Sequence, residues 1–209
     1  MKIVASVRDL ATFDQAVALA ADMIELRLDL MDGDLAGQAR KMRGMTDIPL
    51  IATMRSRDEG GAFEGDAAAW NELVYPVIPF VDYVDVETRY REHVPAIKSQ
   101  GVQIIASLHT RSMPVRSELE QIEASLRSFG DLPKIVVQPG TKEDVVDLLS
   151  YVCTAKKPLC VSIMGEQFRY VRAFLPLFGS ELVYCHTGTP TSPGQYRVDE
   201  FRQLMGMLR

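Results

Sequence analysis

The chain has few of the features that mark secreted, membrane-bound or nucleic-acid-binding proteins. Its 209 residues include only three cysteines, Cys153, Cys160 and Cys185, whose spacing fits no metal site and whose odd number indicates free thiols in a reducing compartment. No apolar run approaches the ~20 residues of a membrane span, and the first residues lack the features of a signal peptide. The net charge of −5 argues against a nucleic-acid partner. We therefore expect a cytoplasmic protein whose partners include neither a membrane nor a nucleic acid.

The composition itself is that of an ordinary globular protein, with 47% hydrophobic and 24% charged residues. Apolar, β-branched stretches alternate with stretches whose apolar residues follow helical spacing. The predicted strands are 2–7, 22–29, 49–55, 83–87, 102–109, 134–138, 159–164 and 182–186. The predicted helices are 9–21, 35–43, 66–77, 92–99, 117–129, 141–154, 167–177 and 198–208.

Strict alternation of strands and helices predicts parallel strands joined by helical crossovers. Eight such units predict a compact (β/α)8 barrel, a TIM barrel, as a single domain over residues 1–209. The alternative is a doubly wound open sheet. Its dinucleotide-binding form is disfavoured because no G-x-G-x-x-G motif follows the first predicted strand.

One lysine is predicted to lie inside a strand. Pro133 and Pro139 bracket a β-branched run that begins with Lys134, whereas the other lysines fall on polar helices, at turns or near the N-terminus. Burial disfavours a charged ammonium and lowers the pKa of a lysine, and a neutral amine can form a Schiff base with a carbonyl. The alternative is a strand-end lysine whose alkyl chain reaches water.

Polar residues gather toward the C-terminal ends of the predicted strands, spaced two apart so that both side chains of a pair point to one side. The pairs are Glu25 and Arg27, Thr53 and Arg55, Asp85 and Glu87, and Ser107 and His109, with Lys134 on the next strand. A rim salt bridge explains any single pair. Repetition over five consecutive strands instead favours a shared site at the C-terminal face, where the active sites of these barrels lie.

His109 is predicted to lie beside Lys134 on the neighbouring strand, where an imidazole can act as a general acid and base. A histidine at a strand end can equally be held by a hydrogen bond without a catalytic role. Three arginines, Arg27, Arg55 and Arg172, would form an anion-binding surface or would neutralise the nearby carboxylates. The loop 187–195, rich in Gly, Pro and hydroxyl residues, predicts a lid or simply a long connection.

A divalent metal is the rival interpretation of Asp85, Glu87 and His109, because carboxylates and an imidazole are suitable ligands. The arginines and Lys134 add positive charge and disfavour a cation. We therefore predict no metal.

Six motifs occur in order along nearly the whole chain. They are Glu25-Leu-Arg-Leu-Asp29, Thr53-Met-Arg55 with Glu59-Gly-Gly61, Ser107-Leu-His109, Pro133-Lys-Ile-Val-Val137, Met164-Gly165 with Arg172, and Ser192-Pro-Gly-Gln195. Together they resemble the type I 3-dehydroquinate dehydratases, the Schiff-base dehydratases of the shikimate pathway. The resemblance implies a (β/α)8 barrel that uses no metal and no organic cofactor.

The same resemblance implies roles for nine residues. Lys134 would be the Schiff-base lysine, His109 the general acid and base, and Glu59 the carboxylate that positions this histidine. The residues implied to contact the substrate are Glu25, Arg27, Arg55, Arg172, Thr191 and Gln195. Among these, Arg172 would bind the substrate carboxylate, and Gln195 would reach the substrate from the lid.

Two departures from the family pattern are visible. Thr191 stands where the family often has a serine, although it keeps the hydroxyl. The stretch 167–172 lacks the glycine and serine often found before the arginine, which leaves the shape of this loop open. Asp85 and Glu87 also match the family pattern, and no catalytic step is assigned to them.

The sequence therefore predicts a lyase that converts 3-dehydroquinate to 3-dehydroshikimate. Lys134 would form an imine with the ring ketone, and His109 would remove the adjacent proton and then assist the loss of the β-hydroxyl as water. A class I aldolase or transaldolase would use the same lysine, and a non-catalytic carboxylate-binding barrel is the alternative from another class. A homodimer is expected because many barrels pair through surface helices.

Overall fold

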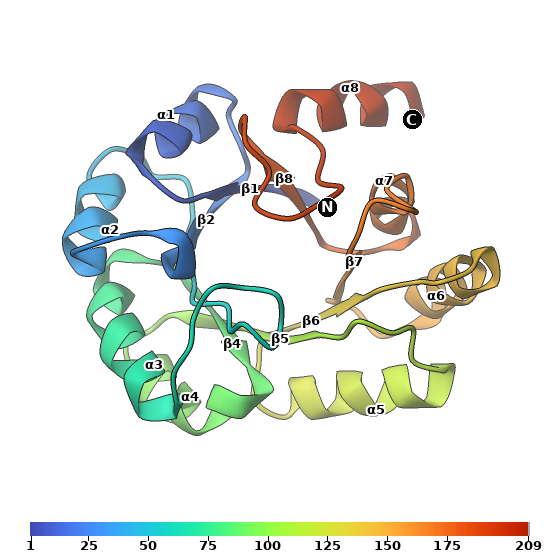
Figure 1. Ribbon diagram of the computed structural model, residues 1–209, viewed down its shortest axis with the longest axis horizontal. Coiled ribbons are helices and arrows are strands. Elements are labelled where there is room, and N and C mark those ends of the chain that lie inside the picture. Colours follow the sequence, from blue (N-terminus) through green and yellow to red (C-terminus); the bar gives the residue numbers. More distant parts are fainter. Residues whose placement is uncertain (209) are drawn as a thin grey trace.

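The computed structural model describes residues 1–208, so Arg209, which the single-domain prediction included, lies outside the described residues. The strands are β1 Lys2–Val7, β2 Met23–Arg27, β3 Leu50–Thr53, β4 Tyr83–Glu87, β5 Gln103–His109, β6 Leu132–Val137, β7 Cys160–Ile163 and β8 Leu182–His186. They form one sheet in the order β7-β6-β5-β4-β3-β2-β1-β8, with every pairing parallel. The sheet curls into a nearly closed ring (Figure 1). The predicted (β/α)8 barrel is confirmed.

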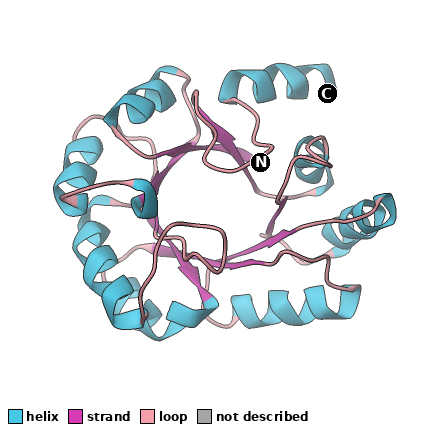
Figure 2. Cartoon of the chain, in the orientation of Figure 1, coloured by secondary structure: helices cyan, strands magenta, loops and turns pink. Residues whose placement is uncertain are grey.

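Helices surround this ring on its outside (Figure 2). They are α1 Leu10–Ala18, α2 Leu35–Arg43, α3 Ala67–Val74, α4 Val94–Lys98, α5 Arg116–Arg127, α6 Lys142–Thr154, α7 Val171–Phe174 and α8 Val198–Leu208. Side-chain caps begin several of them: Asp34, Asp66 and Thr141 each accept a backbone N–H from the first turn. Within residues 1–208 no helix is both long enough and apolar enough to cross a membrane.

The ring closes differently at one place. β1 pairs with β8, but β7 and β8 share no strand ladder in the described chain. Their contact runs instead through Ser180, whose hydroxyl accepts a hydrogen bond from Val161 N at 2.9 Å and donates one to Val161 O at 3.0 Å. Just beyond it, Glu181 N donates to Leu159 O at 2.9 Å. One serine side chain thus replaces the ladder at the β7–β8 seam.

The core lies on both faces of the sheet. Outward side chains such as Ile24, Leu26 and Val84 pack beneath the helices. Inside the barrel, at the N-terminal end of the strands, lies a smaller apolar layer, which we call the floor. The floor consists of Val4, Met23, Ile51, Tyr83, Ile105, Leu132, Cys160 and Leu182. Side chains therefore fill this end of the barrel and leave the opposite end available for a site.

The predicted strand 134–138 begins two residues earlier in the structure, because β6 spans Leu132–Val137. Lys134 is therefore inside the strand rather than at its start. Its neighbours along β5 and β7 are Ser107 and Cys160. This position holds the lysine backbone on both sides.

The helix predicted at 167–177 is largely wrong. Only Val171–Phe174 is α-helical, and a 3-10 turn follows it. The residues before it form tight turns instead, in which Arg169 N donates to Glu166 O at 3.1 Å. Pro176 lacks the N–H that would extend the α-helical pattern. The predicted helices 66–77 and 92–99 are likewise shorter and include 3-10 turns.

Candidate active site

The side chains that point into the barrel change from apolar to polar at the equivalent position of every strand. Two positions after each floor residue stands a residue with a polar group, and we call these eight residues the polar ring. They are Ser6, Glu25, Thr53, Asp85, Ser107, Lys134, Ser162 and Tyr184. Each of them has less than a tenth of its surface exposed to solvent. Since residues two apart on a strand point to the same side, the ring lies directly above the floor.

Lys134 is buried in this ring, with only 4% of its surface exposed. Its Nζ lies 2.9 Å from Asp85 Oδ2 and 3.9 Å from Glu25 Oε1. The ring of Tyr184 faces the same ammonium, with its centroid 3.9 Å from Nζ. The lysine does not reach bulk water along its alkyl chain, so the alternative of a strand-end lysine that snorkels is wrong.

Arg55 is the centre of a carboxylate network. Its guanidinium lies 2.7 Å from Asp85, 2.9 Å from Glu87 and 3.3 Å from Glu59. Although burial opposes ionisation, Arg55 and Lys134 together hold the pKa of Asp85 well below its usual range. Of the two sequence-based interpretations of this arginine, neutralisation of carboxylates is the one that the contacts support.

Glu87 holds the loop that follows β3. Its Oε1 accepts the backbone N–H of Ser56 at 2.8 Å, and its Oε2 accepts the hydroxyl of Ser56 at 2.6 Å. The next turn of the loop carries Glu59. Gly61 is required there, because a Cβ at this position would lie 2.1 Å from Arg55 O. The loop thus fixes Glu59 relative to the barrel.

His109 is held by Glu59 through two contacts with one oxygen. Glu59 Oε2 accepts the backbone N–H of His109 at 2.9 Å and lies 2.8 Å from its Nδ1. Burial, Arg55 and Lys134 lower the pKa of His109 well below its ordinary value. Burial also raises the pKa of Glu59 to about 8, against the effect of Arg55. Glu59 thus fixes the orientation of the imidazole.

Glu25 and Arg27 are both committed to neighbours. Glu25 accepts the hydroxyls of Ser6 at 2.6 Å and Thr53 at 2.9 Å. Arg27 makes a bidentate pair with Asp29, at 2.9 and 2.7 Å. Both side chains are therefore held in place at the pocket wall. The positive charge of Arg27 is balanced by Asp29.

Arg172 differs from the other two arginines. It is 5% exposed and has no carboxylate within salt-bridge distance among the described residues. Its contacts are Ser162 Oγ at 3.4 Å and Pro193 O at 3.1 Å, and its Nε is buried without a partner in residues 1–208. Burial lowers the pKa of Arg172 to about 10, which still leaves the group charged at neutral pH. A buried cation of this kind requires an anion.

The loop that was predicted to be a lid lies beside Arg172. Gln195 Oε1 accepts the backbone N–H of Thr191 at 2.9 Å and its hydroxyl at 3.1 Å, so the two residues brace each other. Gly194, with φ of 79°, approaches Gly165 so closely that a Cβ would lie 2.4 Å from Gly165 O. A glycine is therefore needed where the loop 187–195 packs against the loop after β7.

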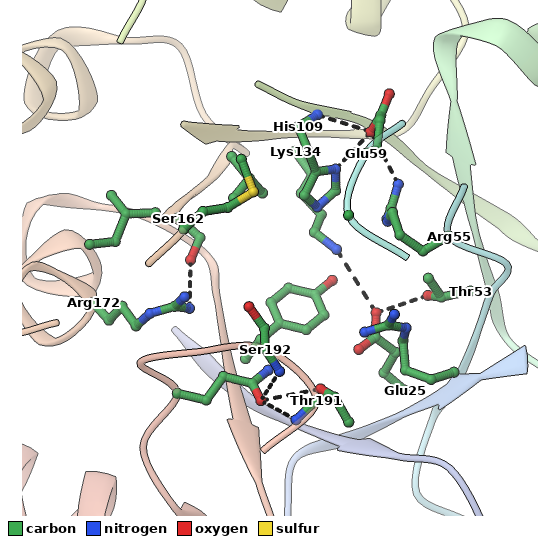
Figure 3. Close-up of a pocket in the computed structure, with 17 residues that line it drawn as sticks. Glu25, Thr53, Arg55, Glu59, His109, Lys134, Ser162, Arg172, Thr191 and Ser192 are labelled. Atoms are coloured by element: carbon green, nitrogen blue, oxygen red, sulfur yellow. Dashed lines mark hydrogen bonds and ion pairs between the residues drawn. The ribbon is translucent and has the colours of Figure 1, made fainter. Parts of the chain in front are cut away.

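All nine residues that the resemblance implied line one pocket: Glu25, Arg27, Arg55, Glu59, His109, Lys134, Arg172, Thr191 and Gln195. Figure 3 shows Lys134, His109, Glu59 and Arg55 on one side of it and Arg172 with Ser162 on the other. His186, at the end of β8, is not among the residues that line the pocket. Asp85, Ser162 and Tyr184 contact the site residues directly and were assigned no role from the sequence.

The rival metal site has no geometric support in the described chain. Asp85 and Glu87 both face the guanidinium of Arg55, and Asp85 also binds Lys134. No group of three or more potential metal ligands is close enough to hold an ion within residues 1–208. These carboxylates instead balance the positive side chains of the pocket.

Comparisons with known proteins agree on one family. The sequence profile of the family described as Type I 3-dehydroquinase matches residues 4–209. The chain is 47% identical to the 3-dehydroquinate dehydratase of Methanoregula boonei, with all of both chains covered. It is 38% identical to that of Methanospirillum hungatei, covering 100% of this chain and 81% of the relative. The crystal structure of the 3-dehydroquinate dehydratase from Aquifex aeolicus superposes with a TM-score of 0.86 at 25% identity, covering 99% and 98% of the two chains.

Proposed function

Because the chain belongs to the type I 3-dehydroquinase family, we propose that it dehydrates 3-dehydroquinate to 3-dehydroshikimate through a Schiff base on Lys134. It is an enzyme, a 3-dehydroquinate dehydratase of the shikimate pathway. The observation that carries the Schiff-base mechanism is the position of Lys134. It is a buried primary amine that lines the same pocket as a neutral imidazole and an arginine that has no carboxylate partner among residues 1–208.

Lys134 supplies the nucleophile. The ammonium gives up one proton, and the nitrogen then attacks the ketone carbon of the substrate, forming a C–N bond while the ketone oxygen takes up a proton. Loss of that oxygen as water leaves a protonated imine, which withdraws electrons from the adjacent carbon. Asp85 at 2.9 Å and Glu25 at 3.9 Å balance the positive charge that remains on the nitrogen.

His109 supplies the base and then the acid. Its lowered pKa keeps the imidazole neutral, and the contact of Nδ1 with Glu59 at 2.8 Å fixes the orientation of the ring. His109 removes the proton next to the imine carbon to give an enamine, then returns this proton to the β-hydroxyl as it leaves as water. Hydrolysis of the imine releases the product and restores Lys134.

Arg172 binds the substrate carboxylate. It is the buried cation without a carboxylate partner in the described residues, and the polar Ser162 and the lid surround it. A carboxylate placed there is fixed on the opposite side of the pocket from Lys134 (Figure 3). Holding the substrate at both ends aligns the reacting atoms and removes part of the entropic barrier.

Trapping with borohydride tests the mechanism. The protein is mixed with 3-dehydroquinate and borohydride, and its intact mass is measured. We expect one covalent adduct per chain, located at Lys134 by peptide mapping, and neither turnover nor adduct in Lys134→Ala. Arg55 still pairs with Asp85 in that variant, so it should remain folded. Lys98→Ala, which alters a surface lysine paired with Asp131, is the matched control and should behave as wild type.

Other outcomes separate the alternatives. An adduct at Lys98 or Lys142 would reject the assignment of Lys134. Turnover without an adduct would reject the Schiff base while leaving the dehydratase activity intact. An adduct without formation of 3-dehydroshikimate would favour an aldolase, and tight binding with neither would favour a carboxylate-binding barrel.

We also propose that the enzyme is a cytoplasmic homodimer. Exposed apolar side chains on and beside α6 and α7 support the association: Val146, Tyr170, Leu177 and Phe178. The three cysteines are all unpaired in the described structure, which fits a reducing compartment. Sedimentation velocity should give the mass of two chains for wild type and of one chain for Phe178→Glu. A monomeric wild type at micromolar concentration would contradict the dimer.

A further inference from the structure

Tyr184 carries a hydroxyl that the barrel leaves without a partner. The residue lies in β8 opposite Val4 of β1, and it is 6% exposed. Its hydroxyl oxygen is inaccessible to solvent, and it makes no hydrogen bond within residues 1–208. The same residue lines the pocket and places its ring against the ammonium of Lys134, with the centroid 3.9 Å from Nζ.

Other hydroxyls of the polar ring are satisfied. Ser6 and Thr53 donate to Glu25 at 2.6 and 2.9 Å, and Ser107 donates to Asp85 at 2.5 Å. Buried hydroxyls are normally paired because an unpaired one has lost its hydration without compensation. Tyr184 is thus the exception in the polar ring, because the other hydroxyls take part in hydrogen bonds.

Packing does not explain the hydroxyl. The ring of Tyr184 packs against residues of the floor, and a phenylalanine ring would fill the same space. The contact of the ring with the Lys134 ammonium is made by the aromatic face and needs no hydroxyl either. An oxygen that neither packing nor ion pairing requires, buried beside the nucleophile, is available for a ligand.

We propose that the Tyr184 hydroxyl donates a hydrogen bond to the substrate oxygen on the carbon that Lys134 attacks, first as ketone and then as carbinolamine. This assignment rests on the Schiff-base function proposed above. That oxygen is two bonds from Nζ, and the Tyr184 ring lies directly against Nζ. The phenol keeps its proton throughout, and the hydrogen bond stabilises negative charge that develops on the oxygen during the attack.

The surroundings keep the phenol a donor. Burial, Glu25 and Cys160 raise the pKa of Tyr184 well above its ordinary value, so the hydroxyl retains its hydrogen at every pH at which the enzyme works. Neither Glu25 nor Asp85 accepts this hydrogen within residues 1–208, although both accept hydroxyls of the polar ring. The phenol therefore keeps an unused donor beside the nucleophile.

Tyr184→Phe tests this role, because it removes one oxygen and keeps the ring. The rate of adduct formation is followed by rapid mixing with saturating 3-dehydroquinate and quenching in borohydride. We expect this rate to fall at least tenfold, since loss of one such donor typically slows attack by ~10²–10³-fold. The midpoint of urea unfolding should not fall, because no hydrogen bond of the free protein is removed. Tyr90→Phe, which removes a buried hydroxyl beside Trp70 outside the pocket lining, is the matched control.

Three outcomes are decisive. An unchanged rate of adduct formation in Tyr184→Phe would overturn the assignment. A loss that vanishes at saturating substrate would also overturn it, because the hydroxyl would then bind another substrate group rather than assist attack. A wild-type chain that gives no adduct would refute the Schiff-base function itself, whereas a wild-type adduct with an unaffected variant refutes Tyr184 alone.

Discussion

Each side of the pocket has a buried arginine, but only one of the two arginines is paired with carboxylates. On the side of β3, β4 and β5, Arg55 lies within 3.3 Å of three carboxylates. On the side of β7 and β8, Arg172 is buried to a similar degree and has no carboxylate partner in the described part of the chain. We call these the paired side and the open side.

The difference shows that the partners of a buried charge distinguish a structural role from a ligand-binding role. A buried cation surrounded by carboxylates is part of the protein's own framework, and removing it leaves those carboxylates uncompensated. A buried cation without such partners costs free energy in the empty protein, and the cost is recovered when an anionic ligand binds. We therefore propose that the paired side builds the catalytic geometry and that the open side binds the carboxylate of the substrate.

The largest effect within the paired side is expected at His109, whose alteration leaves Lys134 and the arginines in place. His109→Ala should slow turnover by at least ~10²–10⁴-fold, the loss typical of a general acid and base. It should still form the imine, so the borohydride adduct should accumulate while little product appears. Intact-protein mass beside the steady-state rate provides the measurement. Turnover near the wild-type rate would remove His109 from the mechanism.

Matched substitutions of the two arginines test the comparison directly. Arg55→Gln should lower the free energy of unfolding by about 3–5 kcal/mol, because three buried carboxylates lose their common partner. Arg172→Gln should leave that free energy unchanged or raise it, since no ion pair of the described chain is broken. It should instead raise KM, by an amount equivalent to about 2–5 kcal/mol of lost binding.

Urea unfolding and steady-state kinetics of both variants separate the two roles. Equal losses of stability in Arg55→Gln and Arg172→Gln would erase the distinction between the sides. Recovery of binding in Arg172→Lys, with poorer orientation of the carboxylate, would further sharpen it.

The lid on the open side is predicted to depend on a single glycine contact. Gly194→Ala places a Cβ 2.4 Å from Gly165 O, so the lid must move away from the loop after β7. A displacement of about 1 Å can cost up to ~10²-fold in rate, and we expect kcat/KM to fall toward this limit. Gly33→Ala is the control, because Gly33 has the same φ of 79° but nothing within 4 Å of the added Cβ. Equal kinetics of the two variants would mean that the contact of Gly194 with Gly165 does not limit the reaction.

The smallest expected effect concerns pH. The folded state lowers the pKa of His109 below its unfolded value, so the stabilisation linked to the neutral imidazole is complete above about pH 6.5. It is lost as the pH falls through the lower, folded-state pKa. Glu59, whose raised pKa favours the folded state as the pH falls, opposes this loss in wild type. The urea midpoint of His109→Gln should therefore rise relative to that of wild type as the pH falls below 6.5, because the variant lacks the penalty from His109.

The control for this pH series is His93→Gln, in the outer layer of the barrel. It should reproduce the wild-type profile. A difference between wild type and His109→Gln that stays constant from pH 6.5 to pH 4.5 would contradict the burial of a neutral His109, because protonation of the unfolded chain would then carry no penalty.

Much of this site was predictable because strand periodicity decides which side chains share a face. Glu25 and Arg27, or Thr53 and Arg55, had to point the same way once their strands were identified. The alternation of strands and helices then brought these pairs to one end of the barrel. The helix at 167–177 was not predictable in this way, because apolar spacing does not distinguish α-helical from 3-10 hydrogen bonding when a proline stands within the segment.

The partners of the charges were also beyond prediction. Strands in a barrel are staggered, so the distance between Asp85 and Lys134 depends on a register that no single strand reveals. Ser162 and Tyr184 gave little signal, since hydroxyl residues are common in strands. A usable signal existed nonetheless: on all eight strands a polar group stands two positions after an apolar, inward-facing residue.

The pairing of β1 with β8 has a consequence for the order in which the chain can be completed. Strands made first and last are neighbours, while β7, made just before β8, offers it no ladder in the described chain. During synthesis the exposed edge of β1 therefore waits for some 180 residues before its partner leaves the ribosome. An unpaired strand edge is a template for wrong association. The nascent enzyme is thus most vulnerable to aggregation until its final strand and helix emerge.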